Sequence, residues 1–314
     1  FFNVLKVFEI VMTGGRNPIS NEPMFKYLTR DLTDFASFED FFDAFTSELR
    51  RSLNLTFKLM DITCEEWAER RPQFLVSSQV EDCIARGRGI NNGGARYEDY
   101  GSTPIGLPNV ADSLFAIKKA VFEDKIVGAD ELLKALRADF SGYDLLHNRL
   151  KKIPKYGQGD SEADEMMARV VRTTCDIYEA YTNRLNGKIK PMIMTFMIAP
   201  RAGMAVGATP DGRLRQKPVA QGITPQNSAM TKGITAAMLS QSVIGLNRFS
   251  GGASSMWDLD VQAATTDNVI PLLKTFLSIG GQMYQGNTTD VRELLAAQKQ
   301  PDQYQNLLVR IGGY

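Results

Sequence analysis

The chain has few side chains of the types that most often act as nucleophiles, bases or metal ligands. It contains three cysteines and one histidine. The spacing of Cys64, Cys83 and Cys175 matches no metal or disulfide framework, and an odd number of thiols cannot all pair. A metal site needs a cluster of ligands, and none occurs. His147 alone cannot build a catalytic triad unless the fold brings it to a cysteine.

The last five residues are the most informative stretch. They read Arg-Ile-Gly-Gly-Tyr at positions 310–314 and follow an apolar run. A Gly-Gly pair after a strand can be only a turn. The pentapeptide also resembles the Arg-Val-(Ser/Ala)-Gly-Tyr motif of the glycyl radical enzymes, the family of pyruvate formate-lyase and the glycerol and choline lyases. Gly312 stands where that family has Ser or Ala, and Ile311 where it has Val.

The resemblance implies that Gly313 carries a stable carbon radical as a post-translational modification. Conjugation with the amide nitrogen and carbonyl needs a planar Cα, and glycine has no side chain to crowd it. Arg310 and Tyr314 would anchor the loop by hydrogen bonds and packing. No directly bound cofactor is implied. Activation would need a partner, a radical S-adenosylmethionine enzyme that removes hydrogen from Gly313.

Further segments resemble the same family. The matches are Gly-Gly-Ala-Arg-Tyr at 93–97, Asn-Val-Ala-Asp-Ser-Leu-Phe-Ala-Ile-Lys-Lys at 109–119 and Gly-Ala-Thr-Pro-Asp-Gly-Arg at 207–213. Gln285 and Asn287 match a Gln-Phe-Asn triplet and are implied to support the radical loop. The resemblance implies an α/β fold, the C-terminal portion of a ten-stranded α/β barrel surrounded by helices. Residues 1 to about 190 would form the C-terminal end of the lyase-type domain, and residues from about 191 to 314 would form the glycine radical domain.

The sequence lacks the second catalytic motif of this family. The radical glycine takes a hydrogen atom from a cysteine in Gly-Cys-x-Glu, and the thiyl radical then attacks the substrate. Cys64 has the Cys-x-Glu spacing, but Thr63 precedes it. Cys83 and Cys175 lie in expected helices and are predicted to be structural. The chain also begins inside a helical pattern without Met, so we expect a longer protein whose thiyl cysteine lies outside this chain.

The apolar segment 191–199 is predicted to be a buried strand. Along a strand, Ile198, Pro200 and Ala202 would point the same way, where lyases of the family line the substrate pocket. The family often has Phe where Ala202 stands, and the smaller residue would leave room for a larger substrate. Ordinary core packing is the alternative. Arg201 could contact an anion or lie on the surface.

Hydrophobic periodicity predicts the elements that must position these residues. Helices are expected over residues 2–12, 37 to about 60, 74–86, 109–119, 129–138, 163–185, 233–243, 267–279 and 291–299, with a strand at 280–287. The Gly-rich segment 87–97 lacks the Gly-Lys-Ser/Thr ending of a phosphate-binding loop.

Composition is that of a globular protein, with 43% hydrophobic and 23% charged residues. Lys+Arg and Asp+Glu both number 36, which argues against a nucleic-acid or anionic-membrane surface. No membrane-spanning run or signal peptide is visible, and the cysteine content fits a cytoplasmic, reducing setting.

The first hypothesis is therefore the glycine-loop part of an anaerobic dehydratase or lyase that acts on a small organic molecule, homodimeric at full length. Formate C-acetyltransferase is an alternative within the family. A non-catalytic radical carrier or repair protein would explain the absence of the cysteine motif, and a degenerate scaffold without a radical is a third possibility.

Overall fold

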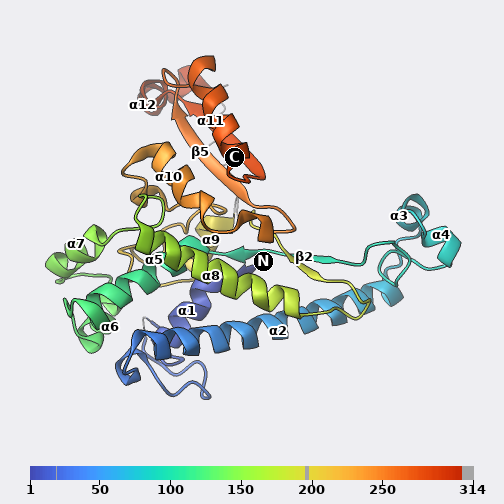
Figure 1. Cartoon of the computed structure of the whole chain (residues 1–314), viewed down its shortest axis with the longest axis horizontal. Helices are drawn as coiled ribbons and strands as arrows, with labels where there is room; N and C mark the ends of the chain where they lie inside the picture. The colour runs from blue at the N-terminus through green and yellow to red at the C-terminus, as the bar shows by residue number, and fades with distance from the viewer. Residues whose placement is uncertain (19, 195–197, 306–314) are drawn as a thin grey trace.

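The computed structural model describes residues 1–18, 20–194 and 198–305. Its core forms around four helices (Figure 1). The short strand β1 (Phe2–Asn3) leads into α1 (Val4–Met12), which packs on the long helix α2 (Phe38–Arg70) and on α5 (Leu107–Ile117). Helix α8 (Ser161–Ala180) covers the other side of α5.

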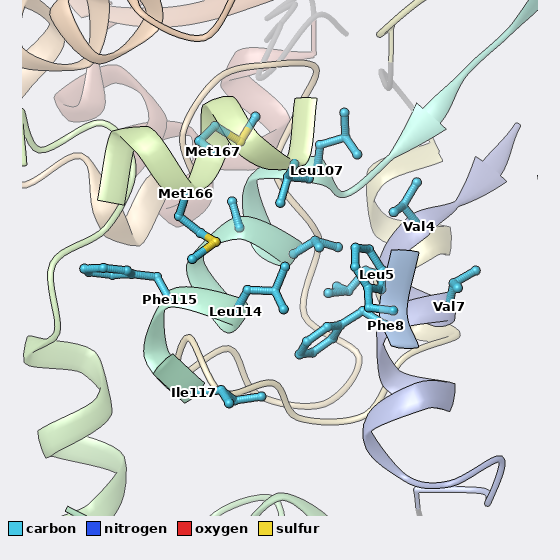
Figure 2. Close-up of a cluster of buried hydrophobic side chains, with 14 of the residues drawn as sticks. Val4, Leu5, Val7, Phe8, Leu107, Leu114, Phe115, Ile117, Met166 and Met167 are labelled. Carbon is cyan, nitrogen blue, oxygen red and sulfur yellow. The ribbon is translucent and has the colours of Figure 1, made fainter. Parts of the chain in front are cut away.

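Helix α5 is the centre of this core, because every one of its residues is buried. Figure 2 shows its apolar side chains between those of α1 and α8, with Leu114 facing Phe8 on one side and Met166 on the other. On α1, Phe8 makes edge-to-face contacts with two rings of α2, at centroid distances of 6.1 Å to Phe41 and 6.2 Å to Phe45. These phenylalanines of α2 therefore lie in the core.

Three predicted helices have different ends in the structure. Helix α2 begins where expected, with Ser37 accepting the amide of Asp40, but it continues to Arg70 because Pro72 is the first residue that stops it. The helix expected over 74–86 is split into α3 (Phe74–Gln79) and α4 (Cys83–Arg86), and Asp82 between them has a left-handed backbone. Helix α8 ends at Ala180 rather than at 185.

The other helices are α6 (Ala129–Arg137), α7 (Asp144–Lys152), α9 (Ile198–Met204), α10 (Gly233–Ser242), α11 (Thr266–Ser278) and α12 (Val291–Lys299). Four of them lie close to their predicted ranges, whereas α7 and α9 were not predicted as helices. Shorter turns are η1 (Leu32–Asp34), the π-helical η2 (Lys118–Glu123), η3 (Asn227–Ala229), η4 (Leu246–Arg248) and η5 (Pro301–Tyr304). No helix in the described ranges is long and apolar enough to cross a membrane.

The strands of the described residues form three parallel pairs. Strand β1 pairs with β3 (Pro104–Ile105), β2 (Tyr100–Ser102) with β4 (Ile189–Pro191), and β5 (Ser254–Asp260) with β6 (Met283–Thr289). Parallel pairs joined by helices are the α/β arrangement expected from the sequence. A second, smaller core of Ala237, Met238, Trp257 and Phe276 joins β5 to α10 and α11.

Two leucines of α2 allow a matched test of this packing. Leu49 is fully buried, whereas Leu55 is 52% exposed. We expect Leu49→Ala to lower the free energy of unfolding by about 2–5 kcal/mol, because it removes buried methyl groups and leaves a cavity. Leu55→Ala should change it by less than about 0.5 kcal/mol. Urea unfolding of the chain measures both, and equal losses would contradict the assigned burial.

Candidate active site

The segment predicted to line a substrate pocket is a helix, not a strand. Strand β4 ends at Pro191, and residues 198–204 form α9. Pro200 is tolerated there because it lies in the first turn, where amide groups have no intrahelical partner. Ile198 and Ala202 are four residues apart and share a face, whereas Pro200 is exposed on another. The predicted alternation was therefore wrong, although the role of the three residues in a pocket is not tested.

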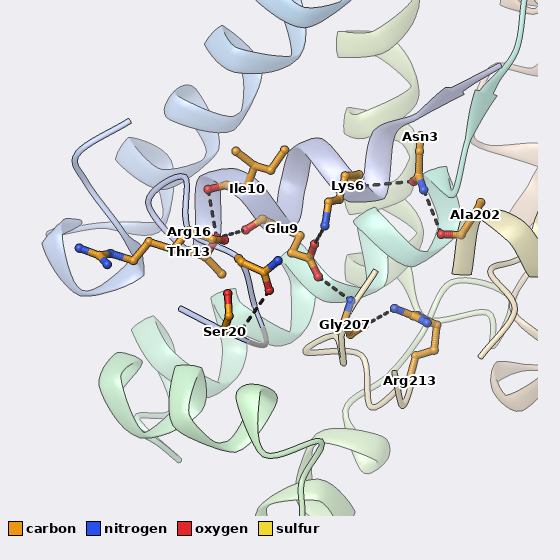
Figure 3. A network of polar contacts seen from close by, with 11 residues as sticks. Asn3, Lys6, Glu9, Ile10, Thr13, Arg16, Ser20, Ala202, Gly207 and Arg213 are labelled. Atoms are coloured by element: carbon orange, nitrogen blue, oxygen red, sulfur yellow. Dashed lines mark hydrogen bonds and ion pairs between the residues drawn. The ribbon is translucent and has the colours of Figure 1, made fainter. Parts of the chain in front are cut away.

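Helix α9 is held by the start of α1. The side-chain amide of Asn3 donates to the carbonyl of Ala202 at 3.0 Å, and its oxygen accepts the amide of Lys6 (Figure 3). On the next residue, a Cβ added at Gly203 would lie 2.0 Å from the carbonyl oxygen of Lys217. Glycine is therefore required for this approach, and the position of α9 is fixed from two sides.

A buried carboxylate on α1 holds the next turn of the chain. Glu9 is 1% exposed, forms an ion pair with Lys6 and accepts the amide of Gly207 at 2.6 Å (Figure 3). The guanidinium of Arg213 in turn donates to the carbonyls of Gly207 and Lys217. Burial lowers the pKa of Arg213, opposed by the charges of Asp211 and Glu9. Arg213 and Glu9 thus fix both ends of the segment 207–213.

The Pro-Asp-Gly stretch at 210–212 forms a turn that is tied to α5. Asp211 accepts the hydroxyl of Thr209, and Gly212 has a φ of +91°, which glycine adopts without strain. Asn109 on α5 donates to Asp211 at 3.1 Å and accepts the amide of Ala220 at 2.7 Å. One asparagine of the central helix therefore positions the turn and the segment that follows it.

A second polar residue of α5 is left only partly bonded. Asp112 is buried, its Oδ1 accepts the amide of Tyr156 at 2.8 Å, and its Oδ2 has no partner. Burial raises its pKa to about 8, opposed by the positive charge of Lys155 and supported by the negative charge of Asp211. Burial also lowers the pKa of Lys155, whose ammonium donates to the carbonyls of Leu150 and Ile153.

The expected support of the radical loop is described only in part. Asn287 on β6 is buried, lies opposite Asp258 on β5, and donates to its carboxylate at 3.1 Å. Gln285 lies opposite Met256 in the same register. The start of β5 is bonded to the segment that precedes α9, since the amide of Ser254 donates to Ile193 at 3.0 Å. Arg310, Gly313 and Tyr314 lie outside the described residues.

The cysteines and the histidine have the settings of structural side chains. Cys175 is fully buried, and burial raises its pKa to about 12, so its thiol stays protonated near neutral pH. Cys83 is buried and Cys64 is half-buried on α2. His147 on α7 stacks on Phe140 at 4.2 Å, with its Nε2 2.8 Å from the carbonyl of Gly212. Among the described residues, no three His, Cys, Asp or Glu side chains could hold a metal ion.

Comparison with known proteins identifies the family. Residues 1–199 match the family model described as pyruvate formate lyase-like, and residues 219–314 match the one described as glycine radical. The chain belongs to the pyruvate formate lyase-like family. The resemblance inferred from the C-terminal pentapeptide and the internal segments is thereby confirmed.

Relatives in this family carry the names of dehydratases. The chain is 32% identical to trans-4-hydroxy-L-proline dehydratase of Clostridioides difficile, covering all of this chain and 40% of that protein. It is 30% identical to the probable dehydratase YbiW of Escherichia coli K12, covering all of this chain and 41% of that protein. The chain thus spans about two fifths of the length of these relatives.

Solved structures confirm the α/β fold expected from the sequence. The glycerol-bound B12-independent glycerol dehydratase from Clostridium butyricum matches with a TM-score of 0.92 at 30% identity, over 99% of this chain and 40% of that one. The hydroxyproline dehydratase from C. difficile matches with a TM-score of 0.92 at 31% identity, over 98% of this chain and 39% of that one. The described structure corresponds to part of the fold of these enzymes.

Sequence reasoning recognised the motifs but assigned no role to the polar residues that position the site. Asn3 at the N-cap of α1, Glu9 on α1, and Asn109 and Asp112 on α5 were not predicted as positioning residues. Each has apolar neighbours in the sequence. A polar residue at a core position needs a partner, so this pattern was the available indication. The partners themselves are up to 199 residues away, as for Asn3 and Ala202.

The pKa of Asp112 leads to a test by pH. Because folding raises it from 3.8 to about 8, this group's contribution to stability is complete below about pH 4 and is lost as the pH rises through 8. The free energy of unfolding should therefore fall between pH 5 and 8, by at most about 1.4 kcal/mol per pH unit from this group. Asp112→Asn should reduce that slope in urea unfolding. Asp43→Asn, an exposed aspartate of α2, should not, and equal slopes in the wild type and Asp112→Asn would contradict the assignment.

Proposed function

We propose that this chain is the glycine-radical part of a dehydratase or lyase, with the radical at Gly313. The match of residues 219–314 to the glycine radical family carries the proposal, because those residues contain the Arg-Ile-Gly-Gly-Tyr stretch. The relatives named above favour a dehydratase or lyase over formate C-acetyltransferase. The substrate would be a small organic molecule.

The proposed chemistry is hydrogen-atom transfer. The Gly313 Cα radical would take the hydrogen of a cysteine S–H, leaving a thiyl radical and an intact glycine. The thiyl radical would then take a hydrogen atom from a C–H bond of the substrate. The sulfur returns that atom to the product radical after the leaving group has departed. Arg310, Tyr314, Gln285 and Asn287 would hold the loop, and Ile198, Pro200 and Ala202 would lie at the substrate.

The cysteine of this scheme is proposed to lie outside the chain. Cys175 is too buried to react, and Cys83 is buried within a short helix. Cys64 lies on α2, which packs on α1 and α8, whereas β6 pairs with β5. The chain's coverage of about 40% of its relatives leaves room for another segment to supply the thiol. A radical S-adenosylmethionine enzyme would activate Gly313, and the full protein would be a cytoplasmic homodimer.

The position of the radical can be tested with two neighbouring glycines. After anaerobic activation of the full-length protein, we expect Gly313→Ala to abolish the glycyl radical doublet in electron paramagnetic resonance, because alanine crowds a planar Cα. Gly312→Ala should retain it, since the family tolerates alanine there. A doublet that survives in Gly313→Ala would overturn the assignment.

The source of the thiol can be read from the coding DNA. If the protein is a complete enzyme, codons for Gly-Cys-x-Glu should occur within a few tens of codons upstream of Phe1. A start codon directly before Phe1 and a stop codon directly after Tyr314 would instead favour the radical carrier or repair protein, which has no thiyl cysteine of its own.

A further inference from the structure

A small polar cavity lies between α5, the end of α7 and the turn that contains Asp211. Its volume is ≈ 150 Å³, and its lining includes Asp112, Lys151, Lys155, Asp211 and Ser228. A single water molecule needs only about 10–15 Å³ of such space. The cavity is therefore large enough for a small polyatomic ligand. It involves residues from both family-matched parts of the chain but none of the residues proposed to carry the radical chemistry.

Lys151 and Lys155 carry positive charge and N–H hydrogen-bond donors that are not fully paired within the protein. The Lys155 ammonium is buried and has three N–H groups, of which two are taken by the carbonyls of Leu150 and Ile153. Lys151 is exposed at the cavity, and no ion pair joins it to another residue of the described ranges. Ser228 on η3 also lines the cavity, and its side chain carries a hydroxyl that can donate a hydrogen bond.

The carboxyl groups of Asp211 and Asp112 differ in whether an oxygen is left without a hydrogen-bond partner. Asp211 is fully engaged, because its Oδ1 accepts from Thr209 and from the amide of Arg213, and its Oδ2 accepts from Asn109. Asp112 has one bonded oxygen and one without a partner, and it is 1% exposed. A buried polar atom without a partner is costly, so a ligand that bonds it would be stabilising.

We propose that this cavity binds a small oxyanion, of the size of inorganic phosphate or a short carboxylate. Lys151 and Lys155 are its cationic ligands, and Ser228 and the buried carboxyl of Asp112 are hydrogen-bond donors to it. With Asp112 protonated, two ammonium groups and one carboxylate leave a single net positive charge. The site does not depend on the proposed radical function.

A cation fits this cavity less well. The ammonium groups of Lys151 and Lys155 would repel a cation in the cavity. The carboxylate oxygens of Asp211 already accept hydrogen bonds from other groups of the protein. No metal-binding group of three His, Cys, Asp or Glu was found within residues 1–18, 20–194 and 198–305. Oxyanions, by contrast, are held in proteins by ammonium groups and hydroxyl donors.

The protonation of Asp112 gives the site a pH dependence of known sign. The groups that face it are Lys155, Asp211 and Asp164, and burial together with the two carboxylates raises its pKa to about 8. Below that pH the carboxyl donates a hydrogen bond, and above it the carboxylate repels an anion. Lys155 acts in the same direction, because losing its proton at high pH also removes an anion ligand. Binding should therefore weaken as the pH rises above 8.

The test is titration of the full-length protein with inorganic phosphate and, separately, with acetate, by calorimetry in a buffer free of both. We expect saturable binding of at least one of them. Lys151→Ala should weaken it about tenfold, the effect of losing one charge-assisted hydrogen bond. Lys152→Ala, which removes the neighbouring exposed lysine that does not line the cavity, should leave it unchanged.

Asp112→Asn gives the sharper test, because an amide donates at every pH. This variant should bind as the wild type does at pH 7 and more tightly than the wild type at pH 9. Circular dichroism checks that each variant is folded. Three results would overturn the proposal: no saturable binding of either anion, equal effects of the Lys151 and Lys152 variants, or loss of binding at pH 7 in folded Asp112→Asn. Which anion binds more tightly distinguishes phosphate from carboxylate ligands.

Discussion

The structure depends on the burial of polar side chains on a helix that has no exposed face. Helix α5 lies at the centre of the core, and such a helix can carry polar groups only where partners reach them. Asn109 meets this requirement by bonding the Pro-Asp-Gly turn and the segment after it. The need to bond the buried side chain of Asn109 thus brings Asp211 and Ala220, more than 100 residues away in the sequence, to the central helix.

Helix α1 does the same on the other side of the core. Asn3 at its N-cap bonds Ala202 of α9, and Glu9 bonds Gly207, so this short helix holds two points of the stretch 200–218 between the two family-matched parts. A buried carboxylate with an ion pair and an amide donor is costly to disturb once formed. The proposed substrate-lining face of α9 is therefore held in place by hydrogen bonds from the start of the chain.

Asp112 departs from this arrangement, because one oxygen of its carboxyl group has no partner, and the buried hydroxyl of Ser113 on the same helix has none either. Buried polar atoms without partners are rare in native proteins, and where they occur they often mark a function or a ligand. The ammonium of Lys155 next to it has one N–H group that is not bonded, and the ammonium of Lys151 forms no ion pair with another described residue. Within one turn of the same helix, the side chain of Asn109 is therefore bonded at both its oxygen and its nitrogen, whereas Asp112 leaves one oxygen without a partner.

The sequence by itself determined the family, the order of most helices and the radical glycine as a candidate, because these follow from local motifs and periodicity. It did not determine that 198–204 is a helix, since a short apolar run has no period that separates strand from helix. Nor did it determine the partners of Asn3, Glu9 and Asp112. Those contacts, and the cavity beside Asp112, exist only because the tertiary structure brings distant segments together around α1 and α5.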